Sequence, residues 1–206
     1  AGWIAVVGLL GLVLFSFVWT IHGFLAVQHP VQGDILVVEG WLSKRMLKRT
    51  LQTFRAGGYN LLVTTGGPIA PDSYLEELYA EYDNIADVAR DALIQLGVPK
   101  NKIAAVPTPP AKTDRTYASV LTLRGWLRGH KPEVHALDVV SRGVHARRTW
   151  LLFSRGLGNS FRVGIYAQEN TNYDAAYWWR SSEGIKTVVK ETLGYLYAKF
   201  LFWPDN

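Results

Sequence analysis

The first part of the chain is a long apolar run. Residues 2–27 are almost all Val, Leu, Ile, Phe, Ala, Gly or Trp, and the polar interruptions are Ser16, Thr20 and His22. At a rise of about 1.5 Å per residue, a helix of this length reaches roughly 39 Å, which exceeds a hydrocarbon layer of about 30 Å. A signal peptide has a shorter apolar core of roughly 7–15 residues, and a buried core helix would carry some polar positions. The pattern therefore favours a membrane anchor, with residues 1–29 forming the anchor helix and its linker.

From residue 30 onward the pattern changes to short apolar runs that alternate with amphipathic segments. Five strands are predicted, over residues 34–38, 61–64, 102–106, 134–140 and 161–167. Helices are predicted over residues 43–56, 74–96, 113–127, 144–155 and 181–202. Strands and helices that alternate in this way form a parallel sheet covered on both faces. Residues 30–206 are therefore predicted to be one α/β domain with a Rossmann-like, three-layer α/β/α fold and a mainly parallel sheet of about five strands.

The charges narrow the possible partners. The 206 residues carry 22 Lys and Arg against 17 Asp and Glu, a net charge of +5, and residues 1–33 carry none of these charges. A basic domain permits an anionic partner such as phosphate or a lipid headgroup. Trp178, Trp179 and the aromatic C-terminal residues lack interleaved basic residues on a sheet face, so core packing or a membrane-interface belt is favoured over nucleic-acid binding. The last helix carries Lys186, Lys190 and Lys199 and could lie against headgroups near the anchor.

Several kinds of chemistry are excluded by residue content. The chain has no cysteine, which rules out disulfides, thiolate metal sites and cysteine catalysis. Its five histidines show no ligand spacing, so a metal site is not expected. The glycine-rich motifs of phosphate loops and dinucleotide-binding folds and the nucleophile elbow of hydrolases are also absent. The sequence therefore identifies no cofactor.

The glycine pair after the second predicted strand is a candidate anion site. Ligands of such sheets bind beyond the carboxyl ends of the strands, so four loops should converge there, at residues 39–41, 64–67, 106–115 and 141–145. In the second loop, Thr65 precedes Gly66 and Gly67, whose backbone N–H groups can approach an anion closely. The alternative is a tight turn between strand and helix.

The loop after the fourth predicted strand offers a second set of candidates. Ser141 and the first N–H groups of the following helix would favour negative charge. His145 and Arg148 lie three residues apart and share one helical face, whereas Arg147 points elsewhere as a solvated or lipid-facing charge. A lone histidine is usually structural, but one placed between Ser and Arg at a strand end is favoured as a site residue.

Two further loops contribute charged candidates. Glu39 and Gly40 end the first strand, and Glu39 is either a proton-exchanging group or a partner for an arginine of another loop. Asp114 precedes the helix that follows the proline-rich loop and is a candidate N-cap. Arg115 and Thr116 would face the same cleft.

Taken together, these segments resemble the YdcF/SanA/ElyC family. The pieces are Leu36-Val37-Val38-Glu39-Gly40, Thr64-Thr65-Gly66-Gly67, Arg115-Thr116, and Val139-Val140-Ser141 through His145, Arg147 and Arg148. The resemblance covers about residues 34–165. It implies an anchored domain on the periplasmic side of a bacterial inner membrane, crossed once by the chain, and a role in the cell envelope. One soluble relative is described as binding S-adenosylmethionine.

Two departures from the family pattern weaken the case for catalysis. Trp41 stands where the family usually has a glycine-rich first loop, and Ala118 stands where it often has a helix glutamate. If that glutamate acts as a general acid or base in the relatives, this chain has lost the group unless Glu39 takes its role.

Two hypotheses therefore follow. In the first, the anchored domain binds a phosphorylated or nucleotide-like anion, with Gly40, Thr65, Gly66, Gly67, Arg115, Thr116, Ser141 and Arg148 as ligand-binding residues and Glu39 and His145 as catalytic residues. In the second, the domain is a non-catalytic accessory or scaffold subunit of a larger membrane complex, held to other transmembrane subunits by residues 2–27 and the last helix. Whether the protein is an enzyme is left open.

Overall fold

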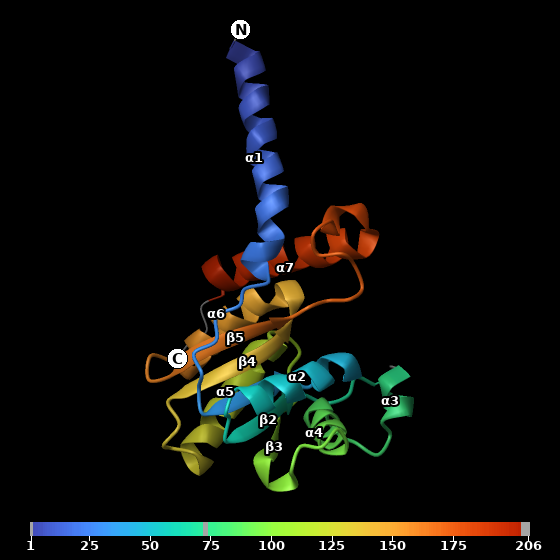
Figure 1. The fold of residues 1–206 in the computed structure, drawn as a ribbon, viewed down its shortest axis with the longest axis vertical. Helices are drawn as coiled ribbons and strands as arrows, with labels where there is room; N and C mark the ends of the chain where they lie inside the picture. The colour runs from blue at the N-terminus through green and yellow to red at the C-terminus, as the bar shows by residue number, and fades with distance from the viewer. Residues whose placement is uncertain (1, 72–73, 203–206) are drawn as a thin grey trace.

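A five-stranded sheet forms the centre of the computed structural model, which describes residues 2–71 and 74–202 (Figure 1). Its strands are β1 (Ile35–Glu39), β2 (Leu61–Gly66), β3 (Ile103–Pro107), β4 (Ala136–Arg142) and β5 (Arg162–Gln168). All neighbours are parallel, in the order β3-β2-β1-β4-β5, and the register places Val37 between Val63 and Val139. The central strands are buried on both faces, which explains their unbroken apolar sequences. The predicted α/β class is confirmed.

The helices cover both faces of the sheet. Helices α2 (Lys44–Ala56) and α4 (Ile85–Gln95) pack on one face against Leu36, Val38 and Leu62. Helices α5 (Arg115–His130) and α6 (Ala146–Leu157) pack on the other face, and α7 (Ser182–Phe200) lies against α6. The remaining helical segments are α1 (Gly2–Leu25), α3 (Tyr74–Leu78) and three short turns, η1 (Lys100–Lys102), η2 (Gly143–His145) and η3 (Trp178–Arg180).

The single helix predicted over residues 74–96 is wrong, because α3 ends at Leu78 and α4 begins at Ile85. Asn84 is extended, and its side-chain oxygen accepts a hydrogen bond of 2.9 Å from the Asp87 N–H, so it caps a new helix. The Ile85 N–H also donates to the Gly67 carbonyl, which ties this helix start to the end of β2. Contact with the sheet therefore interrupts a helical pattern that is continuous in sequence.

Helix α1 projects from the domain (Figure 1), and it is long and apolar enough to cross a membrane. Only 6% of its most apolar window is buried, which distinguishes it from a core helix. Its last turns are different, because Ile21 and Leu25 are buried against Val144 and Val188 of the domain. In addition, Trp178 Nε1 donates to a carbonyl of α1, that of Val18, at 3.1 Å. The end of the predicted anchor is thus part of the domain core.

The linker after α1 is fastened to the sheet. His29 exchanges two backbone hydrogen bonds with Ile165 of β5, of 2.9 and 3.0 Å, in an antiparallel bridge. Asp138, fully buried on β4, accepts hydrogen bonds from the N–H groups of Val31 and Gly33, at 2.8 and 2.9 Å. The hydroxyl of Tyr59 donates a third, at 2.9 Å. A buried carboxylate with three donors therefore holds the linker in place.

Candidate functional site

A cavity of about 980 Å³ lies at the carboxyl ends of the strands. The strand order reverses between β1 and β4, and ligands of doubly wound sheets bind at such a switch point. The cavity walls come from the segments that follow β1, β2, β3 and β4, and from α7. The predicted convergence of four loops is therefore present, with one helix added to it.

The cavity brings most of the predicted site residues together. Eight of the ten line it, namely Glu39, Thr65, Gly66, Gly67, Arg115, Thr116, His145 and Arg148. The other two predicted ligand-binding residues, Gly40 and Ser141, are not among the lining residues.

Gly40 has a steric role in place of the predicted ligand contact. Its N–H donates to the Thr65 carbonyl at 2.7 Å. A Cβ atom at Gly40 would lie 2.7 Å from the Ile85 carbonyl oxygen and 2.8 Å from that of Thr65. Backbone packing on β2 and α4 therefore requires a glycine here.

The predicted position of Ser141 at a helix start is also wrong, because β4 continues two residues further than predicted. Ser141 pairs with Ala167 of β5 and is fully buried, so it does not begin a helix. Its hydroxyl lies 3.1 Å from that of Thr149, and the Thr149 hydroxyl donates to Glu39 Oε2 at 3.5 Å. Since each hydroxyl has one proton, Ser141 donates to Thr149. Ser141 therefore helps to orient the Glu39 carboxylate and does not reach the cavity itself.

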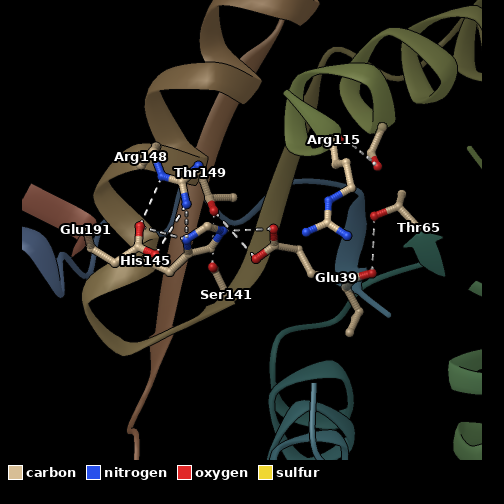
Figure 2. Close-up of polar contacts among 10 residues, drawn as sticks. Glu39, Thr65, Arg115, Ser141, His145, Arg148, Thr149 and Glu191 are labelled. Atoms are coloured by element: carbon tan, nitrogen blue, oxygen red, sulfur yellow. Dashed lines mark hydrogen bonds and ion pairs between the residues drawn. The ribbon is translucent and has the colours of Figure 1, made fainter. Parts of the chain in front are cut away.

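His145 lies between two carboxylates (Figure 2). Its Nδ1 atom is 3.0 Å from Oε2 of Glu191, and its Nε2 atom is 3.5 Å from Oε1 of Glu39. All three side chains are largely buried, with 12% of the His145 side chain exposed. Two acids on either side of one imidazole stabilise its protonated form, in which both ring nitrogens donate.

The ionisation of this group follows from that geometry. Burial alone would lower the pKa of His145, but attraction to Glu39 and hydrogen bonds to Glu191 and Glu39 outweigh it and raise the pKa to about 9. Burial raises the pKa of Glu191, but hydrogen bonds from His145 and Arg148 outweigh this effect and lower the pKa to about 2. At neutral pH the raised pKa favours an imidazolium beside the Glu191 carboxylate. Arg148 Nη2 lies 3.0 Å from the same Nδ1 atom, and in this state its proton is directed to Glu191.

Arg148 completes the pairing of Glu191. Its Nε and Nη2 atoms donate to the two carboxylate oxygens of Glu191, at 3.0 and 3.3 Å. Gly194 on α7 leaves room for this guanidinium, because a Cβ there would lie 3.1 Å from Arg148 Nε. The predicted anion-binding role of Arg148 is thus partly taken by an acid of the same chain.

Other cations at the cavity have no carboxylate partner. Within the described part of the chain, Lys112, Arg115, Arg142 and Lys190 line the cavity and form no salt bridge. Figure 2 shows the Arg115 guanidinium extending from α5 toward Glu39 and Thr65. A negatively charged ligand would supply the hydrogen-bond acceptors that these groups lack.

The start of α5 adds backbone donors to the same wall. Residues 112–116 line the cavity, and α5 is a helix of 16 residues whose first N–H groups have no intrahelical acceptor. Asp114 stands at the N-cap position but has a left-handed backbone, with φ of 50°, and its side chain makes no capping hydrogen bond. The first turn of α5 therefore keeps donors that an anion can use.

Trp41 occupies part of the cavity wall. Its ring meets that of His145 edge to face at 5.3 Å between centroids, and the Arg142 guanidinium lies 5.2 Å from its centroid. Trp41 therefore presents an aromatic side chain to the cavity at the position where the family resemblance implies a glycine-rich loop. Ala118, the other departure, is not among the lining residues.

Sequence reasoning missed Glu191, Arg142 and Lys190. Glu191 is 46 residues from His145 in the chain, on a helix that the sequence suggested for the membrane surface. The sequence indicates this role only weakly. Of the two acids in α7, Glu183 lies in the first turn, where acids are common, whereas Glu191 lies in the middle of the helix. Among the described residues, no group of three or more His, Cys, Asp or Glu side chains is placed to hold a metal ion.

The fold and cavity define a doubly wound α/β protein with a charged site at its switch point. Compared with known proteins, the chain matches no family model and no curated sequence. The function must therefore be argued from the residues of the cavity.

Proposed function

We propose that the chain is a membrane-anchored α/β domain that binds a phosphorylated or nucleotide-like anion in the cavity. The observation that carries this proposal is a set of four cations, Lys112, Arg115, Arg142 and Lys190, around a cavity at the switch point of the sheet, none of which forms a salt bridge with a described residue. Of the three acids among the described lining residues, Glu191 is paired with His145 and Arg148, and Glu39 is paired with His145. Of these three, Asp114 alone is left to offset the four cations. The uncapped start of α5 supports the same ligand class.

The proton chemistry available to such a site is limited by the state of His145. Because the pKa of His145 is raised to about 9, this side chain acts as a cation or a proton donor at neutral pH. Glu39 faces the cavity beside it and is the group that would accept a proton. A ligand phosphate beside the imidazolium would be stabilised by its charge.

The location of the site is also part of the proposal. In this proposal α1 is the anchor, which its length and apolar sequence support, and the resemblance to the YdcF/SanA/ElyC family favours the periplasmic side of a bacterial inner membrane for the domain. Since the chain has no cysteine, a Lys48→Cys variant carries one thiol, exposed on α2. In intact cells, labelling of this thiol by a membrane-impermeant maleimide would support the periplasmic side. Labelling after lysis alone would contradict it.

The binding proposal is tested by calorimetry on the full chain in detergent micelles, with inorganic phosphate and AMP as probes. Arg115→Ala should weaken binding at least about tenfold, because a charge-assisted hydrogen bond contributes about 1.5–3 kcal/mol. Arg128→Ala, at the far end of the same helix, is the matched control and should leave the affinity unchanged. Equal affinities for the two variants would contradict the assigned cavity.

The absence of binding by the unaltered chain to either probe would contradict the proposed function. In that case the alternative of an accessory or scaffold subunit is the better proposal. It is favoured by the mutual pairing of Glu39, His145, Glu191 and Arg148, which suits a structural network. Purification in mild detergent with other membrane subunits bound would support it.

A further inference from the structure

Helix α7 exposes an apolar stripe on the side of the domain from which α1 projects. Ile185, Val189, Leu193, Leu196 and Phe200 recur at three- and four-residue spacing, and each is between 43 and 63% exposed. Their spacing places them on one helical face, opposite the buried face that carries Glu191. This stripe differs from the scattered apolar residues of an ordinary surface, because its members are contiguous.

The position of this stripe relative to α1 is fixed by direct contacts. The rings of Phe24 and Tyr195 meet edge to face at 5.5 Å, and Val188 is buried in the same cluster as Ile21 and Leu25. Figure 1 shows α7 running across the foot of α1. If α1 crosses a bilayer, its C-terminal end lies at the membrane surface, and α7 lies at the same level.

The residues around the stripe are of the types that proteins place at a membrane surface. Lys186 and Lys190 flank it on one side and Lys199 flanks it on the other, as in helices whose lysines reach headgroups while their apolar face enters the acyl region. An aromatic pair lies at α1 nearby: the rings of Trp19 and Trp179 are tilted against each other, with their centroids 5.1 Å apart. Tryptophans concentrate at this depth of a membrane.

We propose that α7 is an interfacial helix whose apolar stripe is buried in the surface of the bilayer that α1 spans. The favoured partner is a lipid surface with anionic headgroups. Three observations select it over a protein partner: α7 packs against the end of the apolar helix α1, lysines flank both sides of the stripe, and α7 runs across the foot of α1. The stripe and the ligand cavity lie on different faces of α7 and share only Lys190 at their border, so the inference holds whether or not phosphate binds in the cavity.

The test uses the absence of cysteine from the chain. Single cysteines at Leu193, at Leu10 of α1 and at Lys48 of α2 are spin-labelled in the full chain, reconstituted in vesicles of phosphatidylcholine and phosphatidylglycerol. All three side chains are exposed, so the substitutions spare the core. Collisions with oxygen, which concentrates in the bilayer, are compared with collisions with a water-soluble nickel complex.

At Leu193→Cys, collisions with oxygen should exceed those with nickel, as at Leu10→Cys. At Lys48→Cys the order should be reversed. Cysteines at positions 185, 189 and 196 should behave like the one at 193. A label at 193 that is as accessible to nickel as the label at 48 would overturn the proposal while leaving the anchor intact. An immobile label at 193, shielded from both reagents, would overturn it in favour of a protein contact.

Discussion

Glu191 of α7 and His145 of η2 are joined by a hydrogen bond of 3.0 Å, although 46 residues separate them in the chain. The bond connects the helix that follows the last strand to the loop that follows β4, and it closes one side of the cavity. The charge state of the site thus depends on how α7 is seated on α6.

Substitution of Glu191 should therefore affect both stability and the imidazole. Glu191→Gln leaves Arg148 and His145 with one fewer buried carboxylate, and breaking such a pair costs about 3–5 kcal/mol. The free energy of unfolding in detergent should fall by roughly this amount. The pKa of His145, followed by NMR of labelled histidine, should fall below about 9, because an attraction that raises it is lost.

The matched control is Glu183→Gln, which removes an acid from the first turn of the same helix. It should cost less than about 1 kcal/mol and leave the titration of His145 unchanged. Equal effects of the two substitutions would show that the buried pair has no special importance.

Stability should depend on pH in a defined window. The pKa of His145 is raised to about 9 from 6.5, so its contribution to stability is complete below pH 6.5 and is lost as the pH rises through 9. The pKa of Glu191 is lowered to about 2 from 4.5, so its contribution is present above pH 4.5 and is lost as the pH falls through 2. The network is therefore most stabilising between pH 4.5 and 6.5.

Denaturant unfolding at several pH values measures this dependence, and His145→Gln is the reference. The difference in stability between the unaltered chain and the variant should shrink from pH 6.5 to 9. A difference that does not shrink over this interval would mean that the imidazole is neutral in the folded protein.

Alanine substitutions at Gly40 and Gly67 should distinguish a glycine that is needed for backbone packing from one that is needed for close approach of a ligand. Gly40→Ala forces a Cβ against two backbone carbonyl oxygens, at 2.7 and 2.8 Å, and should cost about 1–3 kcal/mol. At Gly67 a Cβ would meet only the Thr108 carbonyl oxygen, at 3.8 Å, and Gly67→Ala should change stability by no more than about 0.5 kcal/mol. Thermal unfolding compares the two variants, and calorimetry with phosphate should show weaker binding by Gly67→Ala. A stable Gly40→Ala variant would restore Gly40 as a candidate ligand contact.

Asp138 should control the order of the linker. Asp138→Ala leaves the N–H groups of Val31 and Gly33 without their acceptors, and hydrogen exchange at these two amides should accelerate. Asp138→Asn keeps one acceptor oxygen and should show a smaller increase. Protection that is unaffected by the alanine would mean that the bridge between His29 and Ile165 holds the linker by itself.

The strands were predictable because a covered parallel sheet demands unbroken apolar runs, and Ile35 to Val38 is such a run. The division between α3 and α4 was not, because the helical pattern continues past Asn84 and its capping depends on contact with β2. Sequence alone also placed the end of β4 too early. Pairing with β5 extends it to Arg142, and this shift moved Ser141 from the expected helix start into the sheet.

The site was predictable where the rule for parallel sheets applies. Thr65 lies at the end of β2, Arg115 follows β3 and His145 follows β4, and the topology brings them to one cavity. Glu191 does not lie in the loop directly after a strand but within α7, and its pairing with His145 arises from the packing of α7 on α6, which no local pattern encodes. The predicted ligand class, catalytic roles and family resemblance stay predictions.

The bridge between His29 and Ile165 has a mechanical consequence. A flexible linker would let a domain change its orientation and its distance from the anchor freely. Here the segment that follows α1 pairs with the edge strand β5, so if α1 spans a membrane, rotation of that helix would turn the sheet with it. The opening of the cavity would then keep a constant distance from the membrane and a constant orientation. Molecules that diffuse along the membrane at that distance would meet it more often than molecules that arrive from bulk solution.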